Sequence, residues 1–158
     1  MPKLDLIAPP GKQEIIIRRT FNAPRHLVFR TWTDPKAIPN FWGPRVLSTT
    51  IDQYDARPGG SWRFLQTDPD GNTFGFHGVF HDVTPNERIV QTFEFEGMPG
   101  HVLLETMTFE DAGGKTNIVA TAVFQSVEDR DGMLASGMES GATELYDRLA
   151  EIVEKARV

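Results

Sequence analysis

The chain has 158 residues, of which 39% are hydrophobic and 24% charged, with a formal net charge of −6. This length favours one domain with a sizeable core, and the negative charge with scattered arginines argues against binding nucleic acid. Because the chain has no cysteine, a disulfide framework, a thiolate zinc site and a cysteine nucleophile are excluded, which fits the cytoplasmic location that we expect.

The first residues are predicted to precede the folded domain. Residues 1–12 contain Pro9-Pro10-Gly11, which disfavours regular structure, so we expect a loosely ordered lead-in and a single domain over residues 13–158. The N-terminus lacks the apolar run of a signal peptide. No stretch approaches the ~20 apolar residues that span a bilayer, so we expect no integral membrane segment.

One strand and two short helices are predicted next. Glu14–Phe21 is rich in isoleucine and is typical of a strand. Asn22-Ala23-Pro24 and Asp34-Pro35 each place a capping residue before a proline, which is typical of helix starts. Phe41-Trp42-Gly43-Pro44 follows as an aromatic loop, in which Trp42 either gates a cavity or caps the core.

The middle of the chain predicts six more strands, for a total of seven. They are separated by short turns rich in Gly, Pro, Asn and Asp, which favours an antiparallel meander. The expected strands are Ser48–Tyr54, Ser61–Thr67, Thr73–Val83, Arg88–Glu96, Val102–Glu110 and Thr116–Gln125. Pro58-Gly59-Gly60 is the turn before the second of these.

The last segment, about residues 129–156, predicts one long helix. Apolar residues recur there at spacings of three and four: Leu134, Met138, Ala142, Leu145, Leu149, Ile152 and Ala156. Such a helix would be roughly 40 Å long and could lie across a whole sheet. Gly137 and Gly141 suggest that either the sheet or a ligand approaches the helix closely there.

Alternation along the strands predicts an aromatic inner face and a threonine-rich outer face. The small residues Gly78, Ala120 and Ala122 are also expected to point inward, which leaves room for a cavity. We expect its wall to include Trp42, Trp62, Phe64, Phe76, Phe80, Phe93, Glu105, Met107, Phe124 and Met138. Simple core filling is the alternative for each aromatic residue.

Glu105 is the unusual member of the inner face, with Gln91 on the inward parity of its own strand. A buried carboxyl must be paired, hydrogen-bonded, protonated or bound to something. Glu105 therefore either reaches water near a strand end or is a polar contact inside the cavity.

Catalytic and metal-binding motifs are not recognised. The sequence contains no GxGxxG, Walker, HExxH or GxSxG pattern, so we expect no cofactor and no catalytic residue. His77 and His81 lie about 13 Å apart on a strand and face outward, which excludes a shared metal ion. His26 and His101 are expected at the surface, and Asp68-Pro69-Asp70-Gly71 is a hairpin turn that lacks the later ligands of a calcium loop.

From about Ile15 to Glu154 the chain resembles the homologues of the activator of the Hsp90 ATPase, a branch of the START-like (SRPBCC) superfamily. The motifs that carry the resemblance include Trp32-Thr33-Asp34-Pro35, Phe41-Trp42-Gly43-Pro44, Arg57–Arg63, Pro85–Val90 and the segment from Gly137 to Leu149. The resemblance implies an α+β helix-grip fold, in which a curved seven-stranded antiparallel sheet wraps a long C-terminal helix and two short helices close one end. The family often has tryptophan where Ala142 stands, so this alanine either enlarges the cavity or is repacked.

The resemblance implies a binding function more readily than a reaction. Members of the superfamily bind lipids, hormones or polyketides, some catalyse cyclisations, and most of this branch has no assigned activity. Our first hypothesis is a protein that binds a small hydrophobic molecule in its cavity. The alternatives are an enzyme acting on a hydrophobic substrate there and an interaction module such as an Hsp90 co-chaperone, and a homodimer stays open.

Overall fold

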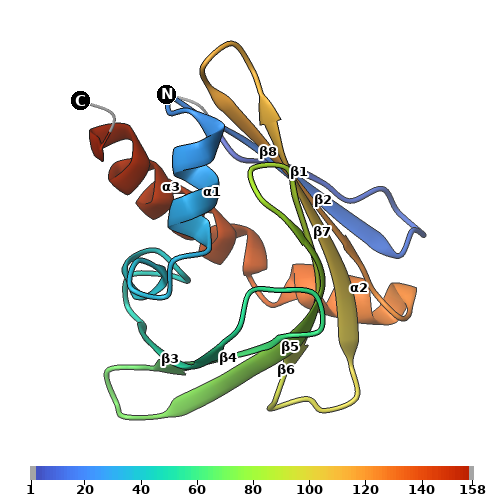
Figure 1. The fold of residues 1–158 in the computed structure, drawn as a ribbon. Helices are drawn as coiled ribbons and strands as arrows, with labels where there is room; N and C mark the ends of the chain where they lie inside the picture. Colours follow the sequence, from blue (N-terminus) through green and yellow to red (C-terminus); the bar gives the residue numbers. More distant parts are fainter. Residues whose placement is uncertain (1–2, 157–158) are drawn as a thin grey trace.

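The structure, a computed structural model, describes residues 3–156. Within these residues the chain is an α+β protein with one antiparallel sheet (Figure 1). The strands are β1 (Asp5–Ile7), β2 (Glu14–Phe21), β3 (Ser48–Tyr54), β4 (Ser61–Thr67), β5 (Thr73–Thr84), β6 (Arg88–Phe95), β7 (Val102–Asp111) and β8 (Thr116–Val123). The helices are α1 (Arg25–Trp32), the short 3-10 helix η1 (Ile38–Asn40), α2 (Val127–Ala135) and α3 (Met138–Ala156).

The sheet order is β1-β2-β8-β7-β6-β5-β4-β3, which confirms the expected meander from β3 to β8. Strand β2 pairs with β8, so the first and last long strands are neighbours, with Ile15 opposite Ala122. The connection through α1 and η1 therefore carries the chain from β2 to the far edge at β3. Figure 1 shows that the sheet curves and that α1 and α3 lie on the same side of it.

The prediction of seven strands was wrong by one. Asp5–Ile7, within the expected lead-in, forms β1 and pairs with β2 in the register Leu6 opposite Ile17. This three-residue strand is too short for its alternation to be recognised against Pro9-Pro10-Gly11. The second expected short helix is also reduced, since only Ile38–Asn40 is helical, as a 3-10 turn with Pro39 inside it.

The prediction of one continuous C-terminal helix was wrong as well. Gly137 adopts φ +85°, a left-handed conformation that ends α2, and α3 begins at the next residue. No atom lies within 4 Å of where a Cβ would stand on Gly137 or Gly141, so neither glycine is required by close packing. Gly137 serves the backbone turn between the two helices.

Helix α3 is fixed to the sheet by apolar packing and by one buried cation. Leu149 and Val153 have no exposed surface, and Arg19 of β2 reaches Asp147 with its Nη2 atom 3.1 Å from Oδ1. The guanidinium of Arg19 also lies 4.9 Å from the ring centre of Phe21. The C-terminal half of α3 thus packs tightly on β2.

The Pro58-Gly59-Gly60 turn between β3 and β4 is closed by backbone bonds to β5. The Gly59 amide donates to the Phe80 carbonyl at 2.9 Å, and the Phe80 amide donates to the Gly60 carbonyl at 2.8 Å. A Cβ on Gly60 would stand 2.0 Å from the Asp55 carbonyl oxygen, so the close approach requires glycine. This turn fixes the start of β4, which carries Trp62 and Phe64 inward.

Candidate functional site

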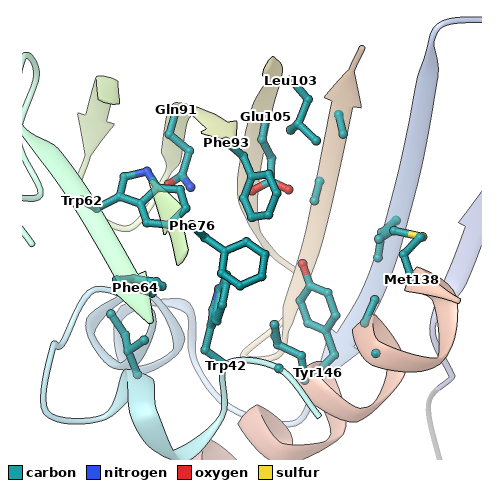
Figure 2. Close-up of a pocket in the computed structure, with 18 of the residues that line it drawn as sticks. Trp42, Trp62, Phe64, Phe76, Gln91, Phe93, Leu103, Glu105, Met138 and Tyr146 are labelled. Atoms are coloured by element: carbon teal, nitrogen blue, oxygen red, sulfur yellow. The ribbon is translucent and has the colours of Figure 1, made fainter. Parts of the chain in front are cut away.

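A cavity of about 340 Å³ lies between the inner face of the sheet and the N-terminal half of α3 (Figure 2). Nine of the ten residues expected in its wall do line it: Trp42, Trp62, Phe64, Phe76, Phe80, Phe93, Glu105, Phe124 and Met138. Met107 does not line it and is buried in the hydrophobic core. Whether these residues bind a ligand stays a prediction.

The cavity has an aromatic wall centred on Trp42. Its ring centre lies 5.0 Å from that of Phe64 and 5.3 Å from that of Phe76, both in edge-to-face arrangements. Phe93 and Trp62 continue this wall, with ring centres 5.9 Å apart. Edge-to-face packing lets these rings hold one another in place around the cavity.

The loop that carries Trp42 is held on both sides. Thr49 Oγ1 donates to the Trp42 carbonyl at 2.9 Å, and Arg148 of α3 donates to the Gly43 carbonyl at 2.8 Å. Gly43 adopts φ +88°, a left-handed conformation that favours glycine at this point of the loop. Trp42 therefore stands at a defined position between β4 and α3.

The opposite wall is made of small and aliphatic side chains. Ala120 and Ala122 of β8 line the cavity, as the alternation predicted, and Gly141 and Ala142 of α3 line it as well. Gly78 does not line it. A Cβ there would stand 1.9 Å from the Thr92 carbonyl oxygen and 2.6 Å from Trp62 Nε1, so this glycine accommodates Trp62 and the neighbouring strand.

Glu105 lines the cavity between the sheet and α3. The residue as a whole is partly exposed, but its carboxyl lies deep enough in the protein for desolvation to dominate its titration. Burial disfavours the charged form and raises the pKa of Glu105 from its ordinary value of 4.5 to about 7. Gln91, directly opposite Glu105 on β6, lines the cavity too.

Tyr146 of α3 is a cavity residue that the sequence reasoning missed. Burial, with a smaller contribution from the negative charge of Glu105, raises the pKa of its hydroxyl. Figure 2 shows Glu105 entering the cavity from the sheet and Tyr146 from α3. Tyr146 follows Ala142 by four residues, so the helical spacing that placed Ala142 inward could have placed it as well. Ile15, Ile17, Trp32, Ile38, Phe41 and Leu145 are further lining residues.

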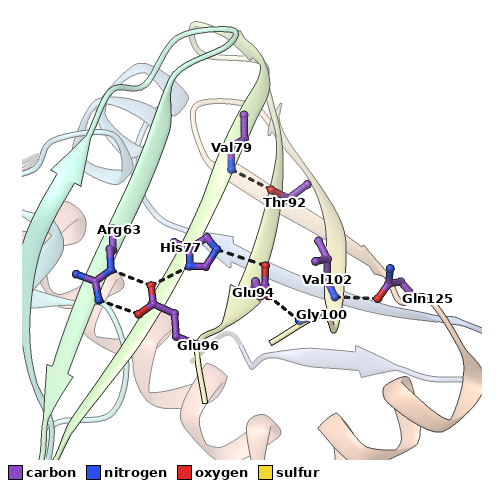
Figure 3. Close-up of polar contacts among 9 residues, drawn as sticks. All are labelled: Arg63, His77, Val79, Thr92, Glu94, Glu96, Gly100, Val102 and Gln125. Atoms are coloured by element: carbon purple, nitrogen blue, oxygen red, sulfur yellow. Dashed lines mark hydrogen bonds and ion pairs between the residues drawn. The ribbon is translucent and has the colours of Figure 1, made fainter. Parts of the chain in front are cut away.

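The histidines of the central strands lie on the outer face, as predicted. His77 Nδ1 is 2.8 Å from a Glu96 oxygen, and Arg63 donates to the same carboxylate at 2.8 and 2.7 Å (Figure 3). These bonds, from Arg63 first and His77 second, lower the pKa of Glu96 to about 2. Among residues 3–156, no three His, Asp or Glu side chains are grouped as a metal site would require.

In the described part of the chain, no helix is both long enough and apolar enough to cross a bilayer.

The chain is similar to proteins of known family and structure. Residues 22–154 match the model of the family described as activator of Hsp90 ATPase homolog 1-like protein. No curated protein matches this chain.

Solved structures share the fold. A crystal structure of a Rhodobacter sphaeroides protein has a TM-score of 0.89 and 23% identity, covering 97% of this chain and 99% of its own. A solution structure of an Arthrobacter aurescens protein has a TM-score of 0.88 and 22% identity, covering 96% and 91%. DynU16, from the dynemicin biosynthetic locus, has a TM-score of 0.71 and 19% identity over 92% of this chain and 48% of that one.

Proposed function

Because the chain belongs to the family of activator of Hsp90 ATPase homolog 1-like proteins, and because an apolar cavity lies under α3, we propose that it binds a small hydrophobic molecule there. The cavity itself carries this proposal. Its volume of about 340 Å³ falls within the range of small-molecule sites, and its lining is mostly aromatic and aliphatic with few polar groups. A protein that needed these residues only for stability would gain from filling the space, since empty volume costs stability.

A titration with 1-decanol, an uncharged apolar probe, tests the proposal by calorimetry. The Ala142→Trp variant places an indole in the cavity, whereas Ser140→Trp adds the same group to an exposed position of the same helix. If the indole of Ala142→Trp keeps two methylene groups of decanol out of the cavity, binding loses about 1.6 kcal/mol. The variant should then bind decanol about tenfold more weakly. Ser140→Trp should bind like the wild type. No binding by the wild-type protein, or equal binding by all three, would contradict the proposal.

Catalysis in the same cavity is a second candidate, favoured by one observation. A carboxyl with a pKa of about 7 exchanges protons readily near neutral pH, which suits a general acid or base. Catalysis ranks second because the described cavity lining includes no Ser, Thr, Cys, Lys or His side chain that could act together with Glu105. A chaperone partner stays a prediction.

A further inference from the structure

The cavity contains one carboxyl and no basic side chain. Among the described residues that line it, Glu105 is the one carboxylic acid, and none is Lys, Arg or His. No hydrogen bond or ion pair joins the Glu105 side chain to any residue between 3 and 156. Its oxygens are therefore free to contact a molecule in the cavity.

The groups around Glu105 leave it without a counter-charge. Gln91 faces it from β6 and Ala122 from β8, and neither titrates. Among the described residues, Tyr146 of α3 interacts electrostatically with Glu105, and its hydroxyl stays neutral because its pKa is raised. The Gln91 and Tyr146 side chains also form no hydrogen bond with the described residues. A ligand thus meets hydrogen-bonding groups here, but no positive charge.

The aromatic wall adds a second preference of the same sign. The faces of Trp42, Phe64, Phe76 and Phe93 carry partial negative charge, and such faces attract cations, most strongly when water is excluded. A carboxylate in a cavity lined by aromatic rings favours a positive ligand group and disfavours a negative one. The net charge of −6 attracts cations to the protein as a whole.

We propose that the ligand of this cavity is a lipophilic amine, whose protonated nitrogen pairs with Glu105 while its apolar body lies against the aromatic wall. This inference rests on the proposed function, and it adds the chemical class of the ligand. Fatty acids and other lipophilic anions are disfavoured, because their carboxylate would meet that of Glu105 without a cation between them.

The proposal predicts a dependence of binding on pH. Glu105 is mostly protonated at pH 6 and mostly ionised at pH 8, since its pKa in the empty cavity is about 7. An alkylamine stays protonated over this range, so its affinity should rise by up to about tenfold between pH 6 and pH 8. The affinity of an uncharged ligand should not rise.

Three probes of equal chain length separate the possibilities: decylamine, 1-decanol and decanoate, titrated by calorimetry at pH 6 and pH 8. At pH 8 decylamine should bind about tenfold more tightly than decanol, as expected for a hydrogen bond to a charged group, and decanoate should bind most weakly. Glu105→Gln should remove the preference for the amine and its pH dependence while preserving decanol binding. Glu110→Gln, an exposed position on the same strand, makes the same change in charge and should leave both intact.

The outcomes distinguish this inference from the function on which it rests. Decanol binding with no preference for decylamine, or a preference that survives in Glu105→Gln, overturns the inference and leaves the apolar cavity as a binding site. Failure of all three probes to bind the wild-type protein overturns both. The pH comparison uses the wild-type protein alone, so the test holds even where the Glu105→Gln variant does not fold.

Discussion

Replacing Glu105 by glutamine should stabilise the protein at high pH and leave its stability unchanged at low pH. In the folded chain the carboxyl has a pKa of about 7, against an ordinary value of 4.5 for the unfolded chain. Since a tenfold change in protonation is worth about 1.4 kcal/mol, ionising the buried carboxyl costs the folded state about 3 kcal/mol.

The sign follows from the direction of the pKa change. Below pH 4.5 the carboxyl is protonated in both states, and burial of its charge costs nothing. As the pH rises from 4.5 towards 7 the unfolded state releases its proton first, so the folded state loses stability, and the loss is complete above pH 7. Glutamine has nearly the same shape as a protonated glutamate and does not titrate.

Urea unfolding of both proteins at pH 5, 6, 7 and 8, followed by circular dichroism, measures this effect. The free energy of unfolding of Glu105→Gln should exceed that of the wild type by about 3 kcal/mol at pH 8 and by less than about 1 kcal/mol at pH 5. Glu110→Gln should show no such trend, because Glu110 is exposed. A difference between Glu105→Gln and wild type that stays constant with pH would refute the deep burial of this carboxyl.

Two further predictions concern the helix junction and the outer face. Gly137→Ala should lower the free energy of unfolding by about 1 kcal/mol, because a Cβ is disfavoured at φ +85°. Gly141→Ala, inside α3 with no atom within 4 Å of the added Cβ, should raise the free energy of unfolding by up to about 1 kcal/mol. Urea unfolding that changes the stability of both variants in the same direction would contradict this account. The Glu96 carboxyl should titrate near pH 2 in a carbon NMR experiment, because its hydrogen bonds to Arg63 favour the ionised form. In Arg63→Gln it should titrate at a higher pH. An unchanged titration midpoint in this variant would contradict the role of Arg63.

The strands and the inward residues were predictable because their patterns are local. Alternation and turn residues gave the bounds of β2, β3 and β4 as the structure has them, and they placed Trp62, Phe64 and Glu105 on the inner face. The family resemblance, confirmed by the match over residues 22–154, supplied the placement of α3 on the sheet.

The remaining features depend on contacts between distant segments. The pairing of β1 with β2 is a tertiary choice that a three-residue strand does not reveal. The break at Gly137 requires a backbone angle, because a glycine inside a helical pattern is compatible with either continuation or termination. Met107 and Phe80 both point inward and are buried in the same core, and only three-dimensional packing shows that Phe80 also borders the cavity.

The sequence also could not predict that the Glu105 carboxyl would lie away from water. Its parity was clear, but a residue near a strand end could have reached water. Its solvation depends on β6, β8 and α3 together, since Gln91, Ala122 and Tyr146 surround it from these three elements.

The central claim is that the space between the sheet and α3 takes up an apolar molecule. Methyl NMR of wild-type protein titrated with 1-decanol tests it most directly, with Ala120, Ala122 and Met138 as reporters inside the cavity and the exposed Val79 and Leu104 as controls. We expect the three cavity methyl signals to shift and saturate at one decanol per chain while the controls stay still. Unshifted cavity signals, or equal shifts at Val79 and Leu104, would contradict the claim.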